Sequence, residues 1–251
     1  MVDAINSEDV SRVCEQGFFS ESIDQNLINQ LIFFLLGCRT GDPRDESPQE
    51  RALIQEITQL ESSLSKKQAD ELKNALENLP TDRTSKMYSS ELTIAFGKIA
   101  ALVASDIPGG LSPAGKSAVG MILGEAPNNP SDKDFIAKVA LWATQLSGAI
   151  ASGIPGVLSD GASKELNILL GGRPNPGDKN YILKVMQYEA LIEVFLAETL
   201  PSSLSTIEKV ELFNLFTNLA NIDLDSKVAP EEVQVALARI QMALTDLFFK
   251  S

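Results

Sequence analysis

The dipeptide Leu-Ser returns at nearly constant spacing along the chain, and this period constrains the fold more than any other feature of the sequence. Its leucines are spaced by 47, 47 and 46 residues, at Leu64, Leu111, Leu158 and Leu204. A longer phrase, DKDFIAKV at 132–139, returns as DKNYILKV at 178–185. A fixed period of this length is typical of repeat architectures, in which each unit is one supersecondary element.

Each unit carries apolar residues at helical spacing. The eighth residue after each leucine is apolar, as Leu72, Val119, Leu166 and Leu212. Apolar residues also occur around the twelfth position, and gaps of three, four and eight residues draw one stripe along a helix. The serine of each Leu-Ser is a predicted N-cap, and Ser65-x-x-Gln68 and Ser205-x-x-Glu208 have the spacing of capping boxes. Each unit therefore begins with an amphipathic helix.

A second helix is predicted after a short polar turn. The repeated DK-x-[FY]-I-x-K-V phrase would form its first turn, with the aspartate near the positive helix end. We expect the aromatic residue and the isoleucine after it, Phe135 and Ile136 in the first copy, to face the core. The phrase is then repeated for a structural reason.

These patterns predict an all-α fold built of tandem helical-hairpin repeats of about 47 residues in a single domain, 1–251. The predicted units are approximately 19–61, 62–106, 107–153, 154–200 and 201–251, with a short leading helix near 7–15. Stacked hairpins bury faces that each would otherwise expose. The units form either an α-solenoid of the broad HEAT or armadillo sort or a compact helical array, and the period does not separate the two.

The composition argues against several functions. Net charge is −13, and an acidic surface repels phosphate backbones, so we expect no nucleic-acid partner. Histidine is absent, which removes the commonest general base and metal ligand. We therefore expect neither an enzyme nor a cofactor.

Two features bear on location. Cys14 and Cys38 are interpreted as reduced thiols, and the polar, acidic N-terminus does not resemble a signal peptide, so a cytoplasmic protein is expected. The charge-free run Val139–Ser159 has the length of a membrane span. It contains polar residues and an Ile-Pro-Gly break, so we predict a buried helix followed by a turn, and no membrane span.

One segment has the spacing of a calcium loop. In 221–232, Asn221, Asp223 and Asp225 occupy places one, three and five of the EF-hand pattern, and Glu232 occupies place twelve. Ser226 replaces the usual glycine, and the same segment is also the ordinary turn between two helices of a unit. A calcium-responsive module is the weaker alternative function.

Trp142, the only tryptophan, is either a core residue or an aromatic floor for an apolar ligand. The small residues Ser147, Gly148 and Ala149 on the same predicted helix could leave space between helices. A carrier of a small apolar ligand between central helices is therefore an alternative function.

The main prediction is a non-enzymatic repeat protein that acts as a protein-binding or self-assembling structural scaffold. A terminal unit has no neighbour on one side, yet the chain ends with Leu247, Phe248 and Phe249. These residues either fold back onto the last hairpin or contact another chain. We assign them as candidate partner contacts, so that a protein partner or a second copy would dock through the terminal units.

Overall fold

A computed structural model describes residues 25–40, 45–201 and 204–249, and within these ranges the protein is helical and has no strand. The prediction of an all-α fold is confirmed. The leading helix predicted near 7–15, and with it Cys14, lies outside the described residues.

The first described residues, 25–35, form a helix that we call the central helix. The helices that follow, with one 3-10 turn after the first, are α2 (Pro48–Leu60), η1 (Glu61–Ser63), α3 (Lys66–Glu77), α4 (Tyr88–Asp106), α5 (Pro113–Gly124), α6 (Phe135–Gly153), α7 (Asp160–Gly171), α8 (Tyr181–Thr199), α9 (Thr206–Ala220) and α10 (Ala229–Phe248).

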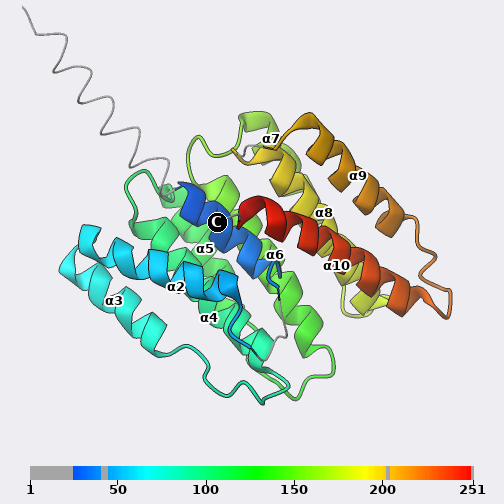
Figure 1. Ribbon diagram of the computed structural model, residues 1–251, viewed down its shortest axis with the longest axis horizontal. Helices are drawn as coiled ribbons and strands as arrows, with labels where there is room; N and C mark the ends of the chain where they lie inside the picture. The colour runs from blue at the N-terminus through cyan, green and yellow to red at the C-terminus, as the bar shows by residue number, and fades with distance from the viewer. Residues whose placement is uncertain (1–24, 41–44, 202–203, 250–251) are drawn as a thin grey trace, which may run out of the picture.

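From α3 onward, short helices alternate with long ones and form two layers (Figure 1). The long helices α4, α6, α8 and α10 pack side by side in chain order. The short helices α5, α7 and α9 each pack against the long helix before and the long helix after them. The long helices thus make an inner layer and the short helices an outer one.

Serine N-caps begin every short helix of this outer layer. Ser65, Ser112, Ser159 and Ser205 each accept a hydrogen bond from the backbone N–H three residues on, which satisfies one of the free donors of the first turn. The capping boxes predicted at Ser65 and Ser205 are both formed. The residues eight positions after the leucines are buried: Leu72, Val119, Leu166 and Leu212.

The repeated DK phrase opens the long helices α6 and α8, and its aspartates form ion pairs. Asp132 binds Lys138, and Asp178 binds Lys184 with 3.3 Å between Oδ2 and Nζ. The aromatic residues Phe135 and Tyr181 are buried, as predicted. The isoleucines after them were predicted to face the core, and that is wrong, because Ile136 is 61% exposed and Ile182 50%. Each helix begins at the aromatic residue, so its neighbour is turned about 100° away from the core.

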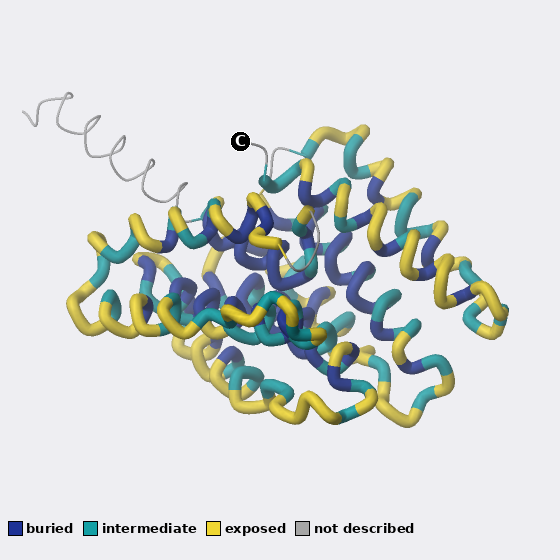
Figure 2. The backbone as a smooth tube through the Cα atoms, turned by 60° about the horizontal axis from the view of Figure 1, so that its bottom comes forward, coloured by how far each residue is buried: buried dark blue, intermediate teal, exposed yellow. Residues whose placement is uncertain are grey.

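The central helix is buried on all sides along most of its length. Every residue from 27 to 36 is buried, and Figure 2 shows buried backbone concentrated in the interior. Phe33 stacks on Phe248 of α10 with ring centroids 3.9 Å apart, and Phe34 lies 4.5 Å from Phe96 of α4. Ser147 of α6 donates to the carbonyl of Ile32. The central helix therefore joins long helices from distant parts of the chain.

Gly37 ends the central helix in a Schellman motif. The N–H of Cys38 donates to the carbonyl of Phe33, and that of Gly37 to the carbonyl of Phe34. Gly37 has a φ of 86°, which favours glycine. A Cβ here would lie 2.7 Å from Nε2 of Gln241, which donates to the carbonyl of Leu36. Gly37 thus ends the central helix and leaves space for Gln241 of α10, which bonds to the last turn of that helix.

In the described part of the chain, α6 is the one helix long and apolar enough to cross a membrane, with a mean hydropathy of 1.2. Of the window that meets this criterion, 61% is buried inside the protein. The helix ends at Gly153 and a turn follows, as the break at 154–156 indicates. Here α6 is packed as a core helix, and the expectation of no membrane span stays a prediction.

Replacing Gly37 by alanine should lower the free energy of unfolding by about 2–3 kcal/mol, because it adds left-handed backbone strain and displaces Gln241. Gly109→Ala is the matched control. Gly109 has a φ of 73° but nothing within 4 Å of its Cβ position, so strain alone should cost about 1 kcal/mol. Urea unfolding measures both. Equal losses would show that the approach of Gln241 contributes nothing.

Candidate functional site

Large apolar side chains reach solvent mainly on the last hairpin, α9 and α10. Ten such side chains are exposed in the described part of the chain, and six of them lie between residues 207 and 242. These six are Ile207, Val210, Phe213, Val228, Val235 and Met242. The first three are spaced three residues apart along the solvent side of α9, so they form a stripe, which we call the α9 stripe.

The α9 stripe is not a general feature of the short helices. Its residues lie two, five and eight positions after the N-cap serine. The same positions hold Lys67, Asp70 and Lys73 in α3; Ala114, Ser117 and Gly120 in α5; and Gly161, Lys164 and Asn167 in α7. None of these nine is a large apolar residue, so packing of a short helix in this fold does not require the stripe.

The three candidate contact residues at the C-terminus lie against the protein's own core. Leu247, Phe248 and Phe249 are each partly buried and contact the main hydrophobic cluster. Phe248 stacks on Phe33, and its carbonyl accepts a hydrogen bond from Gln30 at 3.3 Å. The sequence left two arrangements open for these residues, folding back onto the protein or contact with another chain. The contacts in the structure are those of folding back. Contact with a partner through these residues stays a prediction.

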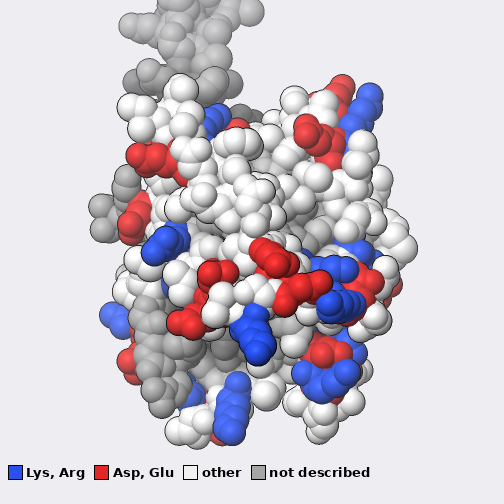
Figure 3. Space-filling view, turned by 90° about the vertical axis from the view of Figure 1, so that its right-hand side faces the viewer, with Lys and Arg blue, Asp and Glu red and all other residues white. Residues whose placement is uncertain are grey.

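The 221–232 segment comprises the turn between α9 and α10 and the first turn of α10. Asp225 accepts hydrogen bonds from Lys179 Nζ at 2.7 Å and from Asn180 Nδ2 at 2.9 Å, and these bonds lower its pKa. Figure 3 looks at the molecule from this side and shows acidic side chains interleaved with basic ones. Among the described residues, no three acidic or cysteine side chains converge to hold a metal ion. Calcium binding stays a prediction.

Trp142 packs in the core and also borders a surface groove. Its side chain is 4% exposed, and Nε1 donates to the carbonyl of Ile122 at the end of α5, at 2.8 Å. On the other side Gly97 of α4 leaves room for the ring, since a Cβ there would lie 2.4 Å from Trp142 Cη2. Tyr188 of α8 bonds in the same way to the carbonyl of Leu170 at the end of α7. The structure thus shows Trp142 packed as a core residue.

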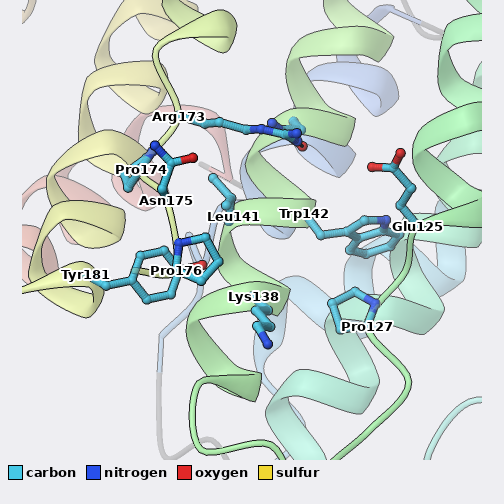
Figure 4. A pocket seen from close by; sticks show the side chains of 11 residues that line it. Glu125, Pro127, Lys138, Leu141, Trp142, Arg173, Pro174, Asn175, Pro176 and Tyr181 are labelled. Atoms are coloured by element: carbon cyan, nitrogen blue, oxygen red, sulfur yellow. Dashed lines mark hydrogen bonds between the residues drawn. The ribbon is translucent and has the colours of Figure 1, made fainter. Parts of the chain in front are cut away.

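The groove lies between the turn after α5 and the turn after α7, and has a volume of about 330 Å³. In Figure 4, Pro174, Asn175, Pro176 and Tyr181 form one side, and Trp142, Glu125 and Pro127 form the other. Leu141 lies behind, with Lys138 below and Arg173 above. We call this the α6 groove.

The small residues of α6 do not leave an open space. A Cβ at Gly148 would lie 2.9 Å from both methyl groups of Leu170, so a side chain of α7 fills the position. Ser147 bonds to the central helix. The ligand-carrier hypothesis gains no support from this part of α6.

Two buried carboxyls lie where α8 meets the central helix and α10. Glu189 is 8% exposed and Glu193 is fully buried. Burial raises the pKa of Glu189 to about 8, and burial together with the nearby Glu189 raises the pKa of Glu193 well above its usual value. Gln241 Nε2 donates to Glu193 Oε1 at 3.1 Å, while Oε2 has no hydrogen-bond partner. No basic side chain of the described residues pairs with either, so burial favours the neutral form of both carboxyls.

A different buried carboxyl shows the contrast. Glu50 of α2 has a side chain only 5% exposed, but Arg83 Nη2 lies 3.3 Å from its Oε1, and the hydroxyl of Tyr88 is close to the same oxygen. Its pKa is still raised by burial, and the Arg83 charge opposes that shift. Glu50 ties α2 to the segment before α4, whereas Glu193 has only the neutral amide of Gln241.

The sequence analysis missed the Glu189 and Glu193 pair. One signal was available: Val185, Glu189 and Glu193 are spaced by four residues, so both acids share the helix stripe of a buried valine. The α6 groove left no such signal, because it depends on the distance between two turns.

Comparison with protein-family models, with curated proteins and with solved structures gave no match. The function is therefore argued from the geometry of this chain alone.

The buried carboxyls should make stability depend on pH. An unfolded glutamate has a pKa near 4.5, and the folded pKa of Glu189 is about 8, so between these values the native state binds more protons. The free energy of unfolding then falls as pH rises, by about 1.4 kcal/mol per pH unit for each extra proton. Glu193→Gln should be more stable than the native protein at pH 8 and should lose less stability between pH 5 and pH 8.

Urea unfolding at several pH values measures this effect. Glu198→Gln, on the same helix but partly exposed, makes the same replacement of a carboxyl by an amide and is the control. A native protein with constant stability between pH 5 and pH 8 would contradict the assignment.

Proposed function

We propose that the chain is a non-enzymatic helical repeat protein that serves as a scaffold and binds a second protein chain through its last hairpin. Several regularities support the repeat. Short and long helices alternate from α3 to α10, and each short helix begins at a serine cap. The Ile-Pro-Gly turns before α5 and α7 both place their glycine at positive φ, 73° at Gly109 and 81° at Gly156.

The proposed array is compact rather than an open superhelix. An open α-solenoid presents a free inner face for binding. Here the central helix contacts α4, α6 and α10, and Cys38 just after it lies within the electrostatic range of Glu193 of α8. Because the chain itself occupies this inner region, we place the binding surface on the outside of the array.

The observation that carries the proposal is the α9 stripe. Ile207, Val210 and Phe213 are 71%, 54% and 57% exposed. Monomeric soluble proteins seldom expose contiguous apolar surface without a function for it. Burying these three side chains would contribute roughly 1.5–3 kcal/mol each before the costs of association.

A second copy of the chain fits this surface. Although the chain carries a net charge of −13, the stripe shares the solvent side of α9 with the uncharged Thr206, Asn214 and Asn218, and one exposed carboxylate, Glu211, borders it four residues after Ile207. Two copies could bring these faces together with Glu211 at the edge of the contact, and oligomers built on such self-complementary patches are common. A stable interface buries about 800 Å² per partner. One helix face supplies part of that area, and the exposed Val235 and Met242 of α10 lie on the same hairpin.

The absence of histidine supports the non-enzymatic part of the proposal, since it removes the side chain most often used for proton transfer near neutral pH. The carboxyls of Glu189 and Glu193 are buried in the interior and do not line the α6 groove.

The double substitution Val210→Lys with Phe213→Ser should abolish self-association, because it places charge and polarity in the stripe. Both residues are exposed, so we expect the free energy of unfolding of the monomer to change by less than about 0.5 kcal/mol each. Sedimentation equilibrium over the micromolar range measures association.

Ile168→Ser is the matched control, since Ile168 is 75% exposed on α7 but lies outside any stripe. It should leave association unchanged. A native protein that is monomeric at every concentration, or a double variant that associates normally, would overturn self-association through α9. Phe248→Ser is unsuited to this purpose, because it would also break the stack on Phe33.

A further inference from the structure

Among the described residues, no hydrogen bond bridges the two turns beside the α6 groove, whereas the corresponding pair of turns one repeat further on is bridged. One repeat further on, Asn180 of the turn before α8 donates to the carbonyl of Leu224 at 2.8 Å and to Asp225, and Lys179 forms an ion pair with Asp225. These bonds bridge the turns before α8 and α10. No such bond joins the turns before α6 and α8 within the described residues, and a space of about 330 Å³ remains.

The groove contains a polar group that lacks a partner. Tyr181 is 6% exposed, its hydroxyl is buried, and the hydroxyl makes no hydrogen bond in the described part of the protein. Figure 4 shows the ring reaching from α8 toward the groove. Buried hydroxyls in native proteins are almost always hydrogen-bonded. An unpaired hydroxyl on one side of a groove is what a ligand's polar atom would satisfy.

The charged groups of the groove favour an anion. Arg173 Nη1 donates to Gln145 Oε1 at 3.1 Å, and this guanidinium has no carboxylate partner among the described residues. Lys138 also lines the groove, although it is paired with Asp132. Glu125 is the one acidic residue of the lining. Glu125 and Asp132 offset the two cations in number, so an anion is favoured here by the guanidinium of Arg173, which has no carboxylate partner among the described residues, and not by net charge.

The remaining walls are flat and apolar. Pro174 and Pro176 lie on the side of the Tyr181 ring, Pro127 lies on the side of Trp142, and Leu141 lies between the two sides. A volume of about 330 Å³ is at the small end of ligand pockets in proteins. A single guanidinium and a hydroxyl suit the two oxygens of a carboxylate. Glu125 at the rim and the acidic surface would oppose a dianion such as a phosphate monoester.

We propose that the α6 groove binds a monocarboxylate with a small apolar body, with Arg173 and the Tyr181 hydroxyl holding the carboxylate and the proline, leucine and tryptophan side chains covering the body. The carboxylate belongs either to a free small acid or to the C-terminus of a peptide ending in an apolar residue. This inference is independent of docking through α9, because the two surfaces share no residue.

Trp142 is the only tryptophan and borders the groove, so its fluorescence reports binding at this place. The full chain is titrated with 3-phenylpropionate and, as the neutral control, with 3-phenylpropionamide. A second arm uses the tripeptide Ala-Gly-Phe with a free or an amidated C-terminus. We expect a saturable change with the acid, and at least about tenfold weaker binding of the amide, because it loses the charge-assisted bond to Arg173.

Variants assign the contacts. Arg173→Gln should remove the preference for acid over amide, and Tyr181→Phe should weaken acid binding about three- to tenfold. Tyr188→Phe is the matched control, since the hydroxyl of Tyr188 bonds to Leu170 and does not line the groove. Circular dichroism checks that each variant is folded.

The outcomes separate clearly. Tighter binding of the free acid than of the peptide supports a small-molecule ligand, and the reverse supports a peptide terminus. Equal binding of acid and amide, unchanged affinity in Arg173→Gln and Tyr181→Phe, or no saturable change in either arm up to millimolar concentration would overturn the proposal.

Discussion

The arrangement of the whole molecule depends on the burial of one apolar helix. From Leu27 to Leu36 no residue of the central helix is exposed, so it has no side that could face water. Its neighbours come from α4, α6 and α10, which approach it with Phe96, Ser147 and Phe248. Helices that packed only against their neighbours in sequence would leave this surface open. The central helix therefore joins helices from distant parts of the chain around a common interior.

Local chemistry explains which parts of this fold the sequence could predict. An N-cap needs a serine and the three residues after it, so Ser65 and Ser205 were predicted correctly from a few positions. The burial of Leu72 and its counterparts followed from helical spacing alone. The prediction for Ile136 also rested on helical spacing. It was wrong because the face on which a residue lies depends on where the first turn of the helix begins. A displacement of one residue rotates a side chain by about 100° and moves it from the core to the surface.

Other features depend on contacts between distant segments, and their prediction from sequence fails for that reason. The sequence leaves two arrangements open for Phe248, because it does not show that Phe33 lies beside it. The α6 groove exists because the turns beside it are not bridged, whereas Asn180 bridges the next pair. Neutral Glu193 requires the packing of α8 on α10 around Gln241. In each case the residue type is visible in the sequence, but its partner is not.

The central helix also has a consequence for how the protein is made. Gln30 bonds to the carbonyl of Phe248 across 218 residues, and Gln241 bonds to Leu36 across 205. During synthesis the apolar segment around Phe33 leaves the ribosome long before α10 exists. Contacts of such long range slow folding, and unpaired apolar segments are prone to aggregate while they wait. The nascent chain must therefore keep this apolar helix from aggregating until α10 has been synthesised.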